Sequence, residues 1–112
     1  MSTPRLNRAL VLETAQDVPD GAGGFDRMWM PQGTIWADVS ARSGRATRGA
    51  AAPVSVTAYR MIVRAAPMGD PARPAAGQRF REGPRVWRIE AVAERDPGAR
   101  HLICFTEEEL TP

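Results

Sequence analysis

The sequence from Val54 to Val92 contains the features that decide the fold. It begins with Val54-Ser-Val-Thr-Ala-Tyr-Arg-Met-Ile-Val-Arg64 and ends with Gln78-Arg-Phe-Arg-Glu-Gly-Pro-Arg-Val-Trp-Arg-Ile-Glu-Ala-Val92. Apolar side chains alternate along both runs, which is typical of β-strands. Glu82-Gly-Pro84 predicts a tight turn inside the second run. We therefore expect one long strand, a proline-rich loop at 66–77, and a hairpin.

The alternation also predicts which side chains of these strands are buried. In the long strand, Met61 and Val63 share a face with Thr57 and Tyr59. In the hairpin, one set is expected to face the core and the other to face solvent: Trp87, Ile89 and Ala91 inward, and Arg88, Glu90 and Glu94 outward.

The flanking segments add further strands. Residues 5–14 and 27–42 are expected to be strands, the second with a break at Pro31-Gln-Gly33, and residues 15–26 are expected to be a flexible loop rich in Gly and Asp. Asp96-Pro-Gly-Ala99 is a turn signal before a last strand at 101–106, and Glu107-Glu-Glu109 is expected to be a solvated end.

These segments predict one domain, residues 1–112, of the mainly β class. About six strands, long loops and no long helix would leave exposed sheet edges in a single open sheet. Closure into a small antiparallel β-barrel or sandwich removes those edges. A chain of 112 residues buries only a modest core, so association with other subunits would stabilise it.

The composition excludes several classes of protein. All 15 basic residues are Arg, which fits either a GC-rich genome or selection for phosphate contacts, and the net charge is only +2. The single cysteine, Cys104, excludes an intrachain disulfide and a Cys-rich metal site, and we expect it to be buried. No signal peptide or membrane-spanning run is evident, so a reducing cytoplasm is expected.

Motifs for catalysis are missing. The only histidine, His101, lies in an expected strand with no catalytic partner nearby in the sequence, and no nucleophile motif or zinc-ligand spacing occurs. The glycines at 21–24 lack the Gly-Lys-Ser/Thr ending of a phosphate-binding loop. We predict no enzymatic activity, no metal and no cofactor.

Two features raise the question of nucleic-acid contact. Arg42, Arg45 and Arg48 lie in a segment, 41–53, without large apolar residues, which is either a solvated surface loop or a basic finger directed at a polyanion. Trp29 and Trp36 are expected to pack on the sheet, because the sequence places only Arg27 close to them, whereas a base-stacking platform needs basic neighbours.

The order of several short motifs resembles a known family. They are Trp36-Ala-Asp-Val39, Ser43-Gly-Arg45, Ala58-Tyr-Arg-Met-Ile-Val-Arg64, Gln78-Arg-Phe80, Arg85-Val-Trp-Arg-Ile-Glu-Ala-Val92 and Leu102-Ile-Cys104. Their order and spacing, from about residue 5 to 109, resemble the head-tail joining proteins of long-tailed phages. These are also called head-closure or stopper proteins, and related proteins occur in prophages and gene transfer agents.

The resemblance implies a β-barrel subunit of a homo-oligomeric, dodecameric ring in the particle neck. The ring would lie below the portal and its adaptor, continue the channel for double-stranded DNA, retain packaged DNA and dock the tail terminator. It implies assembly in the bacterial cytoplasm, with no enzymatic step, cofactor or membrane. The segment containing Arg42, Arg45 and Arg48 matches the loop that can extend toward the channel in this family, so channel-facing placement stands beside plain solvent exposure.

Two other functions remain open from the sequence. One is another neck or tail-completion protein of similar size. The other is a small nucleic-acid-binding barrel of OB or SH3-like type. The second predicts tight nucleic-acid binding by the isolated monomer, whereas the connector predicts weak binding alone and clear binding to a portal–adaptor complex.

Overall fold

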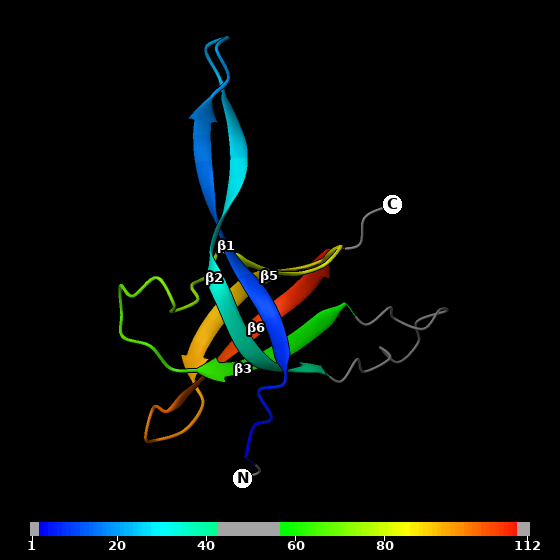
Figure 1. Ribbon diagram of the computed structural model, residues 1–112, viewed down its shortest axis with the longest axis vertical. Helices are drawn as coiled ribbons and strands as arrows, with labels where there is room; N and C mark the ends of the chain where they lie inside the picture. Colours follow the sequence, from blue (N-terminus) through cyan, green and yellow to red (C-terminus); the bar gives the residue numbers. More distant parts are fainter. Residues whose placement is uncertain (1–2, 43–56, 110–112) are drawn as a thin grey trace, which may run out of the picture.

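The fold is a closed β-barrel with one long hairpin extending from it (Figure 1). The computed structural model describes residues 3–42 and 57–109, and every regular element within them is a strand. The strands are β1 (Arg8–Pro19), β2 (Phe25–Ala41), β3 (Ala58–Arg64), β4 (Arg79–Glu82), β5 (Arg85–Glu94) and β6 (His101–Glu109). The predicted mainly β class and six strands are confirmed, and of the two architectures the barrel is the one observed.

Antiparallel pairing closes the barrel in the order β1-β2-β3-β6-β5-β4. The closing contact is short: residues 11–13 of β1 pair with residues 79–81 of β4. The pairing of β3 with β6 is longer and runs from Ala58↔Glu107 to Arg64↔His101. Closure satisfies the backbone groups that an open sheet would leave at its edges.

The core is filled by the inward-facing side chain of alternate residues on every strand. Its fully buried members are Leu10, Leu12, Ala37, Met61, Val63, Phe80, Trp87, Ile89, Leu102 and Cys104. The predicted burial of Cys104 is confirmed, and this burial raises the pKa of its thiol to about 12. Met61 and Val63 also lie on the face predicted for them.

The hairpin β4–β5 is confirmed, with one correction. Trp87 and Ile89 face the core as predicted, but Ala91 is exposed. The register against β6 shifts between Ile89 and Ala91, so a β-bulge inserts one extra residue and reverses the alternation. Val92, and not Ala91, packs against the core after this bulge.

The expected loop at 15–26 is wrong, because most of it is strand. β1 continues to Pro19 and β2 begins at Phe25, so the expected first strand at 5–14 is both shifted and too short. Asp20 holds the turn between them: its carboxylate accepts hydrogen bonds from the amides of Ala22 (2.8 Å) and Gly24 (3.0 Å). These two bonds also lower the pKa of Asp20.

Residues 13–31 form a two-stranded ribbon, which we call the arm, beyond the end of the barrel (Figure 1). The arm begins at a β-bulge, where Leu12 pairs with Gly33 but Glu13 pairs with Pro31. Gly33 has a φ of +148°, a conformation that favours glycine. The predicted break at Pro31–Gly33 is therefore a bulge within one continuous strand.

The remaining comparisons concern the start of β3, the two later loops and the end of β6. β3 begins at Ala58, Thr57 lies outside it, and residues 54–56 are outside the described residues. The loop at 66–77 and the turn at 96–99 are confirmed, with the amide of Ala99 donating to the Asp96 carbonyl oxygen at 2.9 Å. The expected solvated end at 107–109 is wrong, because these residues are the last part of β6.

Candidate functional site

Three surfaces of the molecule are candidates for function. The first is the end of the barrel where segment 43–56 leaves β2 and returns to β3, which we call the loop end. The second is the arm. The third is a pocket beside β2 and β3. Residues 43–56 themselves, including Arg45 and Arg48, lie outside the described residues, so the structure places only Arg42 of the three predicted arginines.

Arg42 lies flat against the outer face of the barrel at the loop end. Its guanidinium donates a hydrogen bond to the Thr106 carbonyl oxygen at 2.8 Å and lies 3.8 Å from a carboxylate oxygen of Glu90. The guanidinium carbon is 5.8 Å from the ring centroid of Phe105. These contacts anchor the start of the segment that follows, whereas the channel role predicted for Arg42, Arg45 and Arg48 stays a prediction.

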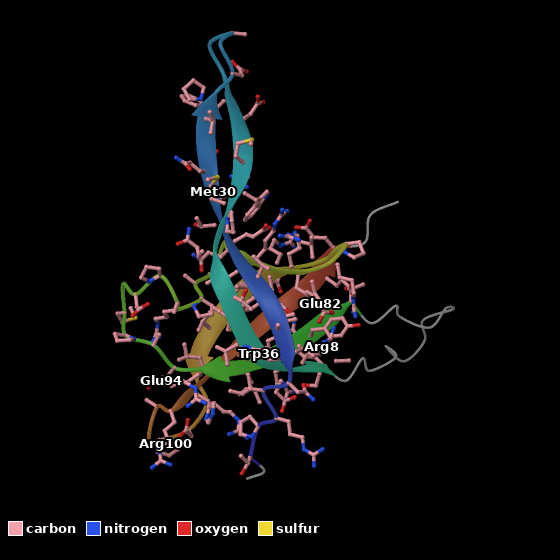
Figure 2. The ribbon with its side chains drawn as sticks, viewed as in Figure 1. Arg8, Met30, Trp36, Glu82, Glu94 and Arg100 are labelled. Carbon is pink, nitrogen blue, oxygen red and sulfur yellow. The ribbon has the colours of Figure 1, made fainter. Side chains whose placement is uncertain are left out.

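Ion pairs fill the mouth of the barrel at the loop end. The Arg8 guanidinium donates two hydrogen bonds to Glu82 (Figure 2). Arg85 donates to both carboxylate oxygens of Glu108, at 2.8 and 3.0 Å. Arg85 also donates to the Tyr59 hydroxyl at 3.2 Å. Bidentate Arg–carboxylate pairs are the strongest geometry for such bonds.

The pKa values follow from these pairs. The hydrogen bonds from Arg8 lower the pKa of Glu82, and those from Arg85 lower the pKa of Glu108. The bond to Glu108 in turn raises the pKa of Arg85. Both arginines at the mouth are thus bound by carboxylates. Because their charge is already neutralised, they attract an approaching phosphate only weakly.

A second cluster fixes the base of the arm. Glu13 is 5% exposed and accepts hydrogen bonds from Arg79 at 2.7 Å and Arg81 at 2.9 Å. Burial raises the pKa of Glu13, but the bonds from Arg81 and Arg79 outweigh it, and the net shift is downward. The Arg79 guanidinium carbon also lies 4.2 Å from the ring centroid of Trp29, which connects the arm to β4.

The two tryptophans of β2 therefore differ. Trp29 packs as predicted, although its basic neighbour Arg79 is far away in the sequence and the local pattern did not reveal it. The ring of Trp36 is 55% exposed, so the expectation that it packs on the sheet is correct only in part. Neither ring belongs to a row of stacked aromatic and basic side chains among the described residues.

Exposed apolar side chains concentrate on the arm. Val18 is 39% exposed, Met30 43%, Met28 50% and Phe25 68%. Cross-strand pairing puts Val18, Met28 and Met30 on one face of the arm, whereas Phe25 lies on the other. Contiguous exposed apolar side chains mark interaction surfaces in soluble proteins.

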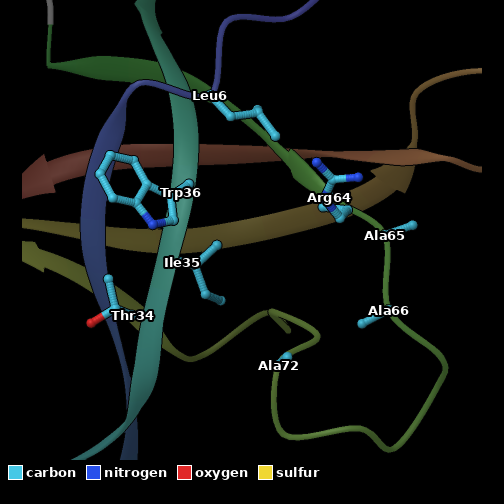
Figure 3. A pocket seen from close by; sticks show the side chains of 8 residues that line it. All are labelled: Leu6, Thr34, Ile35, Trp36, Arg64, Ala65, Ala66 and Ala72. Carbon is cyan, nitrogen blue, oxygen red and sulfur yellow. The ribbon is translucent and has the colours of Figure 1, made fainter.

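A pocket of about 400 Å³ lies between β2 and the segment that follows β3 (Figure 3). Its lining is apolar apart from Thr34 and the cationic Arg64: Leu6, Thr34, Ile35, Trp36, Arg64, Ala65, Ala66 and Ala72. The lining contains no His, Cys, Asp or Glu. The pocket can hold apolar side chains together with one anionic group.

The described residues contain neither a clustered set of metal ligands nor a membrane-spanning helix. Across residues 3–42 and 57–109, no group of three or more His, Cys, Asp or Glu side chains is placed to hold a metal ion. Among the same residues, no helix is long and apolar enough to cross a membrane.

The chain is similar to proteins of phage-like particles. The sequence profile of the family described as phage head completion protein matches residues 1–109. A chain in the structure of the virion of a native gene transfer agent particle is 48% identical, with 97% of this chain and 100% of that chain covered and a TM-score of 0.78. A Shigella flexneri 2a protein known from a solution structure shares the fold at 22% identity, covering 96% of each chain, with a TM-score of 0.68. None of the curated proteins is significantly similar to this chain.

Proposed function

This chain belongs to the phage head completion protein family, and we propose that it forms a ring in the neck of a phage-like particle, a gene transfer agent. In this proposal the ring lies between the portal–adaptor assembly and the tail. It closes the filled head, retains the packaged double-stranded DNA and provides the surface on which the tail terminator docks. The role is structural and requires no reaction step.

One observation carries this proposal. The chain in the native gene transfer agent virion matches this chain at 48% identity from end to end, so the similarity is not confined to one motif. The observed barrel agrees with it, because buried side chains of the core fill the inside of the barrel among the described residues. Function must then lie on the outer surfaces and the segments that project from them.

The proposal assigns retention of DNA to segment 43–56, which contains Arg45 and Arg48 and follows the anchored Arg42. Arg8 and Arg85 at the loop end are bound by Glu82 and Glu108, which leaves Arg45 and Arg48 of the segment as candidates beside the exposed Arg60 of β3. Phosphate contacts from Arg45 and Arg48 would be independent of DNA sequence and sensitive to salt. A ring repeats each weak contact many times, which supports retention without a tight grip by any one subunit.

The proposal is tested by electron microscopy of particles from a producing strain that lacks this gene. We expect separate heads and finished tails, with many heads emptied of DNA. Normal, joined, filled particles would contradict the connector function. Complementation by the intact gene must restore joining, which shows that the defect comes from this chain alone.

A narrower test addresses the arginines of the segment. The double variant Arg45→Ala/Arg48→Ala should assemble joined particles that lose DNA more readily as salt is raised, because Arg–phosphate contacts weaken with ionic strength. Encapsidated DNA is measured by nuclease protection. The matched control, Arg27→Ala/Arg100→Ala, removes two exposed arginines away from the loop end, one on the arm and one before β6, and should retain DNA normally. Equal losses in both variants would exclude a special role for the segment.

A further inference from the structure

One face of the arm continues the core-facing side of the barrel without a core beneath it. Leu12 faces inward, and the strand alternation then puts Thr14, Gln16 and Val18 on the same side of β1. Their cross-strand partners are Met30, Met28 and Asp26, respectively. Because the arm runs past the end of the barrel, Val18, Met28 and Met30 are exposed where comparable side chains in the barrel are buried.

Such a ribbon needs a partner to be stable. Residues 14–19 and 25–30 pair only with one another, as the pairing with β4 ends at Glu13 and that with β3 begins at Ala37. A two-stranded ribbon in water is marginally stable unless a face is covered. The cluster of Glu13, Arg79 and Arg81 holds only its base, so a molecule covering the distal face would stabilise the ribbon.

The pocket beside β2 and β3 has the properties that this face requires. Leu6, Ile35 and Ala66 supply an apolar lining, with Trp36 of β2 at one border and the positive charge of Arg64 at another (Figure 3). The arm face supplies three apolar side chains and the carboxylate of Asp26. Neither Asp26 nor Arg64 has an ion-pair partner within residues 3–42 and 57–109.

We propose that the arm of one copy of this chain docks, through Val18, Asp26, Met28 and Met30, into the Trp36–Arg64 pocket of the next copy. The two surfaces cannot meet within one molecule, since the arm extends away from the barrel that contains the pocket (Figure 1). A contact between two different surfaces of identical chains is heterologous, and it generates a ring when its rotation closes. This inference rests on the proposed ring and names the contact that builds it.

Cysteine cross-linking tests the contact in particles. The variant Met28→Cys/Thr34→Cys puts one thiol on the arm face and one at the pocket, and the native Cys104 is buried and protonated at neutral pH. With a short bis-maleimide, purified particles should give a ladder of multimers of this chain on a denaturing gel. The matched control, Met28→Cys/Arg88→Cys, moves the second thiol to the exposed face of β5 and should give no ladder.

The outcomes separate this inference from the proposed function. Joined, filled particles without a ladder, or with the same ladder in the control, would overturn arm docking while leaving head completion intact. Cross-links from Met28→Cys to a different virion protein would also overturn it, because the arm would then contact an adjacent ring. A gene deletion with no effect on joining would instead contradict the proposed function.

Charge reversal provides a second test on the isolated protein. Asp26→Arg and Arg64→Asp should each weaken self-association at least about tenfold, because each places like charges across the contact. The double variant Asp26→Arg/Arg64→Asp should recover most of that loss, as measured by sedimentation equilibrium. Both side chains are exposed, so the variants should fold. Failure of the double variant to recover would overturn the Asp26–Arg64 pairing.

Discussion

The barrel and the arm are built from the same two strands, yet they differ in almost every physical respect. In the barrel, β1 has a neighbour on each side through residues 11–13, and Leu10 and Leu12 are fully buried. In the arm, the same strand has one neighbour, and Val18 is 39% exposed. The change occurs at the bulge that pairs Glu13 with Pro31.

This contrast shows how a small barrel can combine stability with recognition of a partner. The barrel obtains its stability from burial, which leaves few apolar side chains outside. The arm contributes little burial to its own chain, but it carries apolar side chains to a distance from the barrel (Figure 1). Stability and association are therefore assigned to different parts of one strand pair, and variants should separate the two properties.

The strongest contrast is between two phenylalanines. Phe80 is fully buried in the barrel, whereas Phe25 near the tip of the arm is 68% exposed. Phe80→Ala should lower the free energy of unfolding by about 3–5 kcal/mol, because it removes buried surface and leaves a cavity. Phe25→Ala should change it by less than about 0.5 kcal/mol. Urea denaturation measures both, and similar losses would show that the arm packs on the barrel.

A smaller difference in stability is expected between two carboxylates, Glu13 at the base of the arm and Asp17 farther along it. Glu13 is buried between Arg79 and Arg81, whereas Asp17 forms an exposed pair with Arg27 at 3.9 Å. Glu13→Gln should cost about 2 kcal/mol of unfolding free energy, because two charge-assisted hydrogen bonds are weakened. Asp17→Asn should have no measurable effect, since exposed ion pairs contribute little.

Equal losses of unfolding free energy in the two variants would contradict this prediction. A loss for Asp17→Asn as large as that for Glu13→Gln would mean that the Asp17–Arg27 pair is covered, by self-association or otherwise. Repeating the denaturation at a tenfold lower protein concentration distinguishes these cases, because stabilisation by association depends on protein concentration.

Acid should affect the two regions differently. Glu13, Glu82 and Glu108 have pKa values lowered from their ordinary value of 4.5 in the folded chain. Their stabilisation is complete above that value and is lost as the pH falls through it toward the lowered pKa values. The urea midpoint of the whole barrel should therefore fall between about pH 5 and pH 3.

The control for the acid effect is a variant without one of these pairs. Glu108→Gln should be less stable than the native chain at pH 7, and its urea midpoint should fall less between pH 5 and pH 3. In the arm, Asp20 also has a lowered pKa, but its hydrogen bonds hold only the turn. An unchanged acid slope in Glu108→Gln would contradict the assigned role of the Arg85 pair.

How much of this could be predicted from the sequence differs between the same two regions. The barrel strands were predictable because one face of each is buried, which imposes alternation, as at Phe80, Trp87 and Ile89. The bulge after Ile89 was not, because a shift of one residue leaves no pattern as simple as that of a turn. The arm has no buried face, so its composition resembles that of a loop.

The sequence did contain one indication of the arm. Asp20-Gly21 is a dipeptide typical of hairpin turns, and it lies between two segments of similar length. The ion pairs could not be predicted from the sequence for a different reason. Arg79 and Glu13 are 66 residues apart, and Arg8 and Glu82 are 74 apart, so only the closed barrel brings them together.

The smallest effect expected is one that requires no substitution. In the isolated protein, diluted until it is monomeric, amide hydrogens of Gln16 and Val18 in the arm should exchange faster than those of Leu10 and Leu12 in the barrel. The ribbon can open without unfolding the barrel, and such local opening costs less free energy than global unfolding. Exchange is followed by mass spectrometry of peptides that cover residues 8–13 and 14–30 separately.

In assembled particles the arm peptides should become protected, because docking covers one face and restricts the opening. Equal protection in both regions of the isolated chain would remove the distinction between barrel and arm. Arm peptides that stay unprotected in particles would keep that distinction but show that the arm has no partner there.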